Sequence, residues 1–308
     1  MKIREIASGL QFPEGPVAMP DGSVLVVEIA RGTLTRVLAD GRLQVVAETG
    51  GGPNGAALAP DDTVVVCNNG GFRWTTDPGG IHRPIGQADD YSGGRIERIN
   101  LDTGSVERMY ERCGERPLRG PNDLIFDDAG GFYFTDLGKA REQDLDWGAI
   151  YYARADGSAI EAVVPRAMTP NGTALSPDGR TLYYAETEGA RLWAFDVLAA
   201  GKLRRPDWPP PHGGRLVTAS PGANLQRFDS IAVDAFGNVL VATLLHGGIT
   251  VVSPDGRLAS HIPLPDPFTT NCCFGGHDLR TLYVTLSGTG KLIAIDDWPV
   301  PGLRLVHG

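Results

Sequence analysis

The hydrophobic pattern of the chain is that of short β-strands repeated many times. Short apolar runs are followed by turns such as Pro-Asp-Gly and then by longer runs rich in Val, Leu and Tyr, a pattern typical of β-hairpins. Six copies of this pattern align with one another. They are FPEGPVAMPDGSVLVVE from Phe12, GPNGAALAPDDTVVVCN from Gly52, GPNDLIFDDAGGFYFTD from Gly120, TPNGTALSPDGRTLYYAE from Thr169, RFDSIAVDAFGNVLVAT from Arg227 and TTNCCFGGHDLRTLYVT from Thr269.

A second pair of strands generally follows each copy, so each repeat predicts a four-stranded sheet. The copies begin roughly 40 to 70 residues apart, and no long apolar stripe with helical spacing separates them. This spacing predicts an all-β protein, a six-bladed β-propeller that forms a single domain over residues 1–308. Residues 3–8 precede the first copy in the position that an outer strand holds in other repeats. We therefore predict that the N-terminal strand closes the ring, with the C-terminal GLRLVHG as the alternative.

Two connections between predicted strands are longer than the others. They comprise residues 69–94 in the second repeat and residues 137–148 in the third. Connections longer than about 12–15 residues usually serve as lids or are disordered, and the first of these contains aromatic residues and His82. Both connections follow a second strand, which returns to the end of the sheet where the inner strand begins. We predict that they form walls over one mouth of the central channel; the alternative is ordinary surface packing.

A polar residue occupies the third position of every copy, hereafter the register position. The register residues are Glu14, Asn54, Asn122, Asn171, Asp229 and Asn271. Closure of six blades would place all of them at one mouth of the channel. Two carboxylates near the axis would repel each other and be costly to desolvate without a cation, and no Lys or Arg occupies a register position. Oxygen ligands alone favour Ca²⁺, Mg²⁺ or Mn²⁺ over a structural zinc ion. The alternative is that these side chains cap the inner strands by bonding to backbone amides.

The ends of the second strands are predicted to reach the same mouth. They carry Glu28, Asn68, Asp136 and Glu186, and His246 follows the second strand of the fifth repeat. Of the residues at this end, we include Asn54, Asp136 and His246 among the candidate substrate contacts.

Composition narrows the classes of function. The formal net charge is −9 and no run of basic residues occurs, which argues against a nucleic-acid partner. No stretch of 18 apolar residues occurs, and the first ten residues are too charged for a signal peptide, so we expect no membrane partner and a cytoplasmic location. The cysteines at 67, 113, 272 and 273 lack the spacing of a zinc or redox site. We expect Cys272 and Cys273 to pack as small apolar residues.

Several motifs together resemble the SMP-30/gluconolactonase family of regucalcin-type, metal-dependent lactonases. The matching segments are FPEGP at Phe12, GPND at Gly120, TPNG with SPDG from Thr169, FDSIAVD at Phe228 and NCCFGG at Asn271. Members of that family are six-bladed propellers with one divalent cation in the channel. The resemblance implies that Glu14, Asn171 and Asp229 are the metal ligands. It implies Ca²⁺ as the first candidate, with Mg²⁺, Mn²⁺, Zn²⁺ and Fe²⁺ as further ones.

The resemblance also implies hydrolysis of a lactone, usually an aldonolactone, to the hydroxy acid. Asp229 would then be the general base, and Asn122 would orient water or substrate. Animal members have an Arg two residues before the Asn that matches Asn122, whereas this chain has Gly120 there. Arg119, or Arg73 in the first long connection, is the predicted replacement. A small-molecule lactone is the only partner that follows, and no oligomeric state does.

Two other functions fit the same fold. One is an aryl-lactonase or esterase, and the other is a non-catalytic binding module that the metal only braces. A serine hydrolase is disfavoured, because the sequence has no GxSxG motif and its six histidines suggest no Ser-His-Asp grouping.

Overall fold

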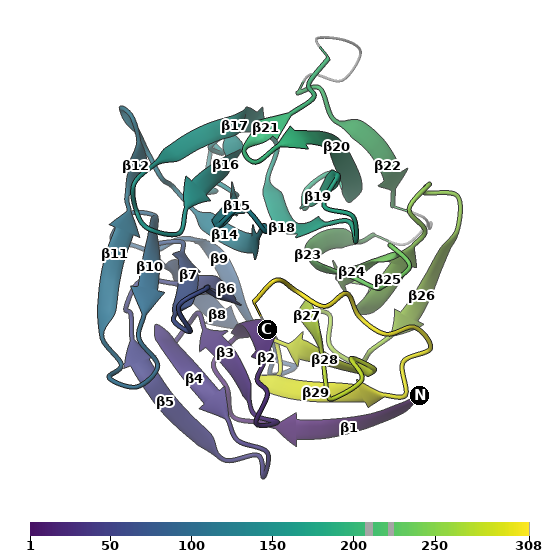
Figure 1. Cartoon of the computed structure of the whole chain (residues 1–308). Helices are drawn as coiled ribbons and strands as arrows, with labels where there is room; N and C mark the ends of the chain where they lie inside the picture. The colour runs from purple at the N-terminus through teal and green to yellow at the C-terminus, as the bar shows by residue number, and fades with distance from the viewer. Residues whose placement is uncertain (207–211, 221–224, 308) are drawn as a thin grey trace.

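The computed structural model describes residues 1–206, 212–220 and 225–307. Their strands form six main sheets arranged in a ring, which confirms the predicted all-β, six-bladed propeller (Figure 1). The predicted domain of residues 1–308 also includes positions 207–211, 221–224 and 308, which lie outside the described residues. Within the described part, no helix has the length and apolar character needed to cross a bilayer.

Each blade runs from an inner strand at the channel to an outer strand at the rim. The inner strands are β2 (Pro13–Ala18), β6 (Pro53–Leu58), β14 (Pro121–Phe126), β18 (Pro170–Leu175), β23 (Arg227–Val233) and β27 (Thr269–Gly275). The second strands are β3 (Val24–Glu28), β7 (Val64–Asn68), β15 (Gly131–Asp136), β19 (Thr181–Glu186), β24 (Val239–Leu244) and β28 (Thr281–Leu286). We number the blades 1 to 6 in this order.

The third strands are β4 (Thr33–Val37), β10 (Arg95–Ile99), β16 (Gly148–Arg154), β20 (Arg191–Ala199), β25 (Gly248–Val252) and β29 (Lys291–Asp296). The outer strands are β5 (Leu43–Glu48), β11 (Val106–Tyr110), β17 (Ile160–Ala167), β22 (Arg215–Ala219), β26 (Ala259–Pro263) and β1 (Lys2–Ala7). Blade 4 carries one extra short strand, β21 (Lys202–Leu203), on β20. A separate two-stranded turn joins β12 (Arg112–Cys113) to β13 (Arg116–Pro117).

The N-terminal strand closes the ring, as predicted. β1 pairs antiparallel with β29, so blade 6 is built from both ends of the chain. The C-terminal segment instead runs across the far end of the channel. There the backbone N–H of Leu303 donates to the Val233 carbonyl, and the His307 ring contacts the Phe126 ring.

The hydrophobic core is divided between the blades. Six apolar clusters lie between blades 1 and 2, 2 and 3, 3 and 4, 4 and 5, 5 and 6, and 6 and 1. Each sheet therefore buries both faces against its neighbours, which is how the repeats form one folded unit. Cys272 is 3 % exposed and belongs to the cluster between blades 5 and 6, in agreement with its predicted packing role.

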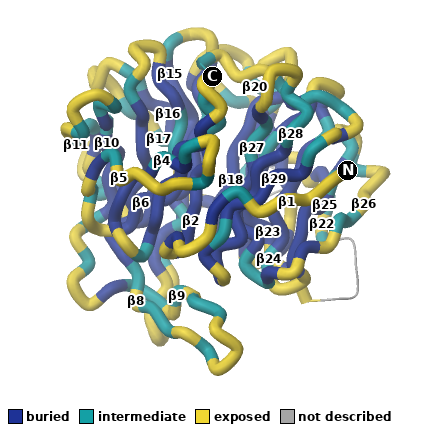
Figure 2. The backbone as a smooth tube through the Cα atoms, turned by 90° about the horizontal axis from the view of Figure 1, so that it is seen from below, coloured by how far each residue is buried: buried dark blue, intermediate teal, exposed yellow. Residues whose placement is uncertain are grey.

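The long connection of blade 2 is a β-hairpin, whose strands the sequence pattern does not predict. It consists of β8 (Phe72–Thr76) and β9 (His82–Gln87), paired antiparallel. The hairpin extends from one end of the ring, whereas the C-terminus lies at the opposite end (Figure 2). We call the hairpin end of the channel, where the inner strands begin, the mouth.

Candidate metal centre

The six inner strands form a closed inner ring. β2 packs against β6 and β27, β14 against β6 and β18, and β23 against β18 and β27. In every blade the pairing between the inner and second strands becomes irregular at or beside the register residue. In blades 1 to 4 the register residue also follows a proline, which donates no backbone hydrogen bond. The inner strands therefore begin outside the regular ladder, with their register residues buried.

Glycines after the register residues allow the inner strands to meet. A Cβ atom added to Gly15 would lie 2.6 Å from the Asn54 carbonyl oxygen, and one added to Gly55 would lie 2.5 Å from that of Asn122. A Cβ atom added to Gly172 would lie 2.4 Å from the Ile231 nitrogen. Backbone contacts this close leave no room for a side chain. The EG and NG pairs of the repeats are thus needed for the approach of neighbouring strands.

Two hydrogen-bonded groups bring register residues of different blades together. The Asn271 Nδ2 atom donates to the Glu14 Oε2 atom at 2.7 Å, and the Gly15 N–H donates to the same oxygen at 2.7 Å. Asn171 hydrogen-bonds to the Asp229 carboxylate, and its Nδ2 atom lies 3.0 Å from the Thr187 Oγ1 atom. Residues from four blades, far apart in sequence, are thereby joined in two pairs at the mouth.

The acids of this group are buried and repel one another. Desolvation raises the pKa of Glu14 and of Asp229, and the charge of Glu14 raises the pKa of Asp229 further. The hydrogen bonds from Asn271 and Asn171 only partly offset this effect. A divalent cation among these acids would favour their ionised forms.

Asp123 is a third acid of the cluster, which the sequence reading missed. Desolvation raises its pKa to about 7, and its charge raises the pKa of both Glu14 and Asp229. Its Oδ1 atom accepts the Leu124 N–H at 2.9 Å. A signal was present in the sequence, because Asp123 stands where three other blades have the glycines described above.

The register residues fit a cation with oxygen ligands. Within the described residues, no three His, Cys, Asp or Glu side chains form a metal site by themselves, so a cation held here would also need carboxamide oxygens. The Oδ1 atoms of Asn122 and Asn171 are buried and have no hydrogen-bond partner among the described residues. An unpaired buried acceptor costs about 1–3 kcal/mol, and a cation or its bound water would satisfy it.

The other predicted substrate residues differ in environment. Asn54 is buried at the mouth, with 5 % of its surface exposed. Arg119 has an exposed side chain beside Gly120. His246 is exposed and stacks on His261, with ring centroids 4.4 Å apart.

Asp136 and its counterparts at the second-strand ends hold loops. The Asp136 carboxylate accepts backbone N–H groups of Arg119, Gly120 and Gly138 at 2.7–2.9 Å. Glu28 accepts the Gln11 N–H at 2.7 Å in the same way, and Asn68 accepts the Gly52 N–H at 2.9 Å. Apart from the bond to Gly138, which holds the connection after β15, these bonds fix segments that lead into an inner strand and its register residue.

The structure leaves no room for a side chain at residue 120. A Cβ atom at residue 120 would lie 2.4 Å from the Gly138 carbonyl oxygen. The connection after β15 therefore occupies the space that a side chain at residue 120 would need. The nearest basic side chain along the chain is the exposed Arg119.

The hairpin β8–β9 contacts loops at the mouth on several blades. The Gln87 N–H of β9 donates to the Ala140 carbonyl of blade 3 at 3.2 Å. The His82 N–H, at the other end of β9, donates to the Gly288 carbonyl of blade 6 at 2.9 Å. Trp74 stacks on His82, with centroids 4.8 Å apart, and lies 5.0 Å from the Phe12 ring. Because blades 3 and 6 are opposite each other in a ring of six, these contacts support the predicted cover over the mouth.

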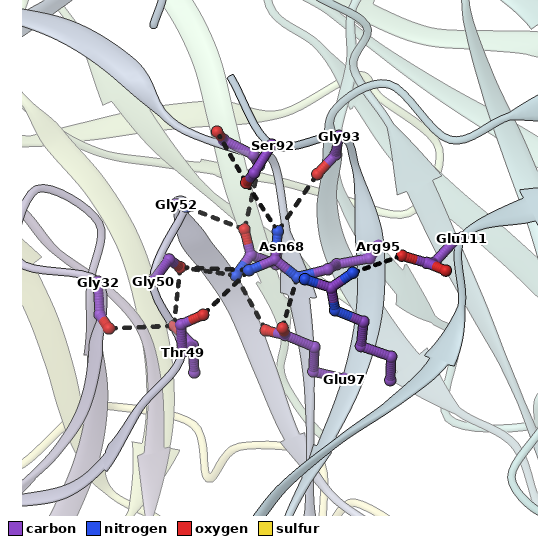
Figure 3. Close-up of polar contacts among 12 residues, drawn as sticks. Gly32, Thr49, Gly50, Gly52, Asn68, Ser92, Gly93, Arg95, Glu97 and Glu111 are labelled. Atoms are coloured by element: carbon purple, nitrogen blue, oxygen red, sulfur yellow. Dashed lines mark hydrogen bonds and ion pairs between the residues drawn. The ribbon is translucent and has the colours of Figure 1, made fainter. Parts of the chain in front are cut away.

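A buried polar network holds the two ends of the blade-2 connection together. Arg95 pairs with Glu97, and both are about 2 % exposed. The Asn68 Nδ2 atom donates to Glu97 at 2.9 Å, and Arg95 reaches Ser92 and the Thr49 carbonyl at 3.0 Å (Figure 3). The strands that enter and leave the connection are thus fixed at its base.

The fold and the acidic cluster define a class: six-bladed propellers with a carboxylate and carboxamide centre in the channel. The family model of the SMP-30/gluconolactonase/LRE-like region matches residues 12–288. The chain therefore belongs to this family.

Known relatives are similar over most of the chain. Lactonase drp35 of Staphylococcus saprophyticus is 29 % identical over 296 residues, which cover 92 % of this chain and 78 % of the relative. The gluconolactonase of Zymomonas mobilis is 25 % identical over 315 residues, which cover 92 % of this chain and 79 % of the relative. A solved structure of a calcium-binding protein, regucalcin from Agrobacterium tumefaciens, superimposes with a TM-score of 0.71 at 21 % identity. That alignment covers 96 % of this chain and 95 % of the regucalcin chain, and it supports the fold alone.

Proposed function

We propose that the protein is a metal-dependent hydrolase that opens a sugar lactone of the aldonolactone type to the hydroxy acid. The observation that carries the proposal is the buried group of Glu14, Asp123 and Asp229 beside the unpaired oxygens of Asn122 and Asn171. Membership in a family whose named relatives include lactonases supports the reaction class. Location in the cytoplasm and a single-domain chain remain predictions from the sequence.

Glu14, Asn171 and Asp229 would hold one divalent cation, with Ca²⁺ as the first candidate. When bound, the cation would polarise the lactone carbonyl, increase the acidity of bound water and stabilise the negative charge that develops in the transition state. Membership in the family supports a divalent cation, and the buried acids supply hard oxygen ligands.

The residues of the chain would handle water and protons. Water adds to the carbonyl carbon, the ring C–O bond breaks, and the ring oxygen leaves as a hydroxyl group. Asp229 accepts the proton of the attacking water and returns a proton to the leaving oxygen. Burial and the charge of Glu14 raise the pKa of Asp229, and a bound cation would offset this effect and keep the carboxylate ionised, so that it can accept the proton. Asn122 presents its unpaired carbonyl oxygen to water or to a sugar hydroxyl. Glu14 anchors the site as an anion.

The exposed groups at the mouth would bind the rest of the lactone. Arg119 and His246 are exposed, and Asn54 lies at the mouth with its side chain buried. Asp136 would act indirectly, because its carboxylate holds the backbone on which Arg119 lies.

A pH-indicator assay tests the proposal. Metal-stripped protein is reconstituted with Ca²⁺, Mg²⁺, Mn²⁺, Zn²⁺ or Fe²⁺ and assayed against aldonolactones and aryl lactones. We expect turnover of an aldonolactone that disappears on stripping and returns with at least one ion. A protein that binds the ion tightly but hydrolyses no lactone would be a binding module.

Asp229→Asn tests the assigned base, because the amide keeps an oxygen ligand but cannot take a proton. We expect turnover to fall about 10²–10⁴-fold with the cation still bound. Asp255→Asn is the matched control, since Asp255 lies in an exposed turn of the same blade. If Asp229→Asn keeps a rate within about tenfold of wild type, Asp229 is not the base.

A second candidate is an aryl-lactonase of the same fold. The aromatic side chains of Phe12, Trp74 and Phe268 lie next to one another at the mouth, with Phe12 5.0 Å from Trp74 and 5.9 Å from Phe268. The same panel separates the two candidates by the ratio of kcat/KM for aryl lactones to that for aldonolactones.

A further inference from the structure

A lysine is buried where the two long connections meet. Lys139 belongs to the blade-3 connection and is 1 % exposed. Its Nζ atom donates to the Asn69 Oδ1 atom at 3.0 Å and to the Gly71 carbonyl at 2.8 Å. The same atom lies 3.9 Å from the centroid of the Phe72 ring and 5.4 Å from that of Tyr91. All four partners belong to the blade-2 connection.

The contacts of residue 139 suit the compact ammonium group of Lys better than the guanidinium group of Arg. Only four of the 28 residues that are Lys or Arg are lysines. An ammonium group has three donors on a single atom, whereas the planar guanidinium of Arg needs more space and stays charged. Two of the three donors are hydrogen-bonded here, and the Phe72 ring lies within cation–π distance.

Lys139 lies at the base of the hairpin that crosses toward blade 6. Phe72, which contacts the ammonium group, is the first residue of β8. Ala140, the next residue after Lys139, accepts the Gln87 N–H at the end of β9. At the start of β9, the His82 N–H donates to the Gly288 carbonyl. The five residue steps of β9 span about 17 Å, so contacts at one end constrain the position of the other.

We propose that Lys139 is a positioning residue that makes docking of the hairpin β8–β9 over the channel mouth depend on pH, through the proton on its ammonium group. Docking buries the ammonium group against Phe72 of the hairpin and against Asn69, Gly71 and Tyr91, which flank its base, and undocking of this whole connection returns the group to water. The proposal concerns the position of the hairpin and does not depend on which reaction the site performs.

The direction of the pH effect follows from linkage. Burial lowers the pKa of Lys139 from 10.5 to about 7 in the docked state. In the undocked state the ammonium group is in water and has its ordinary pKa, so that state binds the proton more tightly. Docking therefore becomes tighter as pH rises from about 7 toward 10.5, and it does not weaken further well below pH 7. With these pKa values for the docked and undocked states, the docking equilibrium constant is expected to increase by up to about 90-fold between pH 6 and pH 9.

The charges around Lys139 do not cancel the effect of burial on its pKa. On its own segment, the charges of Asp136 and Asp146 raise its pKa, but burial outweighs them. Arg141 pairs with Asp146 and holds the pKa of that acid low. From the blade-2 connection, Tyr91 faces the ammonium group, and burial raises the pKa of its phenol above 10. Burial also raises the pKa of Asp136, and a variant without Lys139 reveals any contribution from that acid.

Residue-resolved hydrogen exchange at pH 6, 7, 8 and 9 tests the proposal, with rates corrected for intrinsic exchange. The His82 and Gln87 amides report docking, because they donate to other blades. The Asp77 amide is the internal control, because it donates to Ile81 within the hairpin. We expect protection of His82 and Gln87 to rise about 10- to 90-fold from pH 6 to pH 9 in the wild type, with Asp77 unchanged.

Lys139→Met removes the titrating group and keeps an unbranched side chain only one heavy atom shorter. In this variant we expect protection of His82 and Gln87 to be the same at pH 6 and pH 9 within about threefold. Lys202→Met, a substitution of an exposed lysine, is the matched control and should retain the wild-type pH dependence. A flat profile in wild type, a profile of opposite sign, or a profile that survives in Lys139→Met overturns the proposal.

A second variant serves if Lys139→Met does not fold. Phe72→Leu removes the ring that stabilises the cation, so it should move the lower end of the transition below pH 7. An unchanged transition in Phe72→Leu would also overturn the proposal. None of these measurements uses a lactone, so failure of the proposed reaction would leave this test intact.

Discussion

The three buried acids predict that the metal-free protein is weakened by its own carboxylates at neutral pH. Asp123 allows the size of the effect to be worked out, because burial raises its pKa from 3.8 to about 7. A carboxyl group with a raised native pKa binds its proton more tightly in the folded than in the unfolded state. Its contribution to stability is therefore full below about pH 4 and is lost as pH rises to about 7.

The raised pKa of Asp123 lowers the free energy of unfolding by about 4 kcal/mol at pH 8 and by about 1.5 kcal/mol at pH 5. Asp123→Asn cannot ionise, so it avoids this cost at both pH values. The stability advantage of Asp123→Asn over wild type should therefore be about 2.5 kcal/mol larger at pH 8 than at pH 5. Sharing of protons with Glu14 and Asp229 reduces the gain to about 1–2 kcal/mol, because one proton relieves the repulsion felt by all three acids.

Urea unfolding of metal-stripped protein measures this difference, with wild type and Asp123→Asn compared at pH 5 and pH 8. Asp128→Asn is the matched control, because Asp128 is exposed on the same blade. Ca²⁺ at a hundredfold excess over its Kd should stabilise wild type by about 2.7 kcal/mol. If the stability difference between Asp123→Asn and wild type is the same at both pH values, the acids do not form the electrostatic cluster described above.

Two substitutions test the supports of the site. Gly120→Ala should lower the free energy of unfolding by about 1–3 kcal/mol, because the new Cβ atom would lie 2.4 Å from the Gly138 carbonyl oxygen. Gly79→Ala is its control and should be near neutral, since its nearest neighbour is 3.3 Å away. Thermal or urea unfolding measures both. Arg95→Met should lower the free energy of unfolding by about 3–5 kcal/mol, because it leaves the buried Glu97 carboxylate without its ion pair. Arg42→Met, which breaks an exposed ion pair, is its control and should change stability by less than about 1 kcal/mol. Equal losses within either pair of variants would contradict the steric or the electrostatic reason given for it.

The propeller could be predicted from the sequence because its signals are local and repeated. Each copy contains its own turn and two strands, and every register residue stands at the same place in its copy. The place of the N-terminal strand also followed from the repeat, since residues 3–8 fill the position of an outer strand. β1 holds that position in the structure, paired with β29.

The features that the sequence reading missed depend on contacts between blades. Strand alternation predicts that the residue after a register residue points away from the channel, which hides Asp123 until the irregular pairing of β14 is known. The hairpin of blade 2 was missed because one proline, Pro84, interrupts its second short strand and another, Pro78, lies in its turn. The burial of Lys139 is set by a connection from another blade, about 70 residues away in sequence, and no local pattern reports it.

Hydrogen bonding separates the polar residues that hold the fold from those available for chemistry. The Asp136 carboxylate accepts three backbone N–H groups, so folding itself accounts for its burial. The buried carbonyl oxygens of Asn122 and Asn171 have no partner among the described residues, and each omission costs about 1–3 kcal/mol. Leu, which is close to Asn in size and needs no partner, would avoid that cost if these positions served only the fold. The unpaired oxygens therefore indicate a bound group that the protein chain itself does not supply, and they lie beside the acids that would hold a cation.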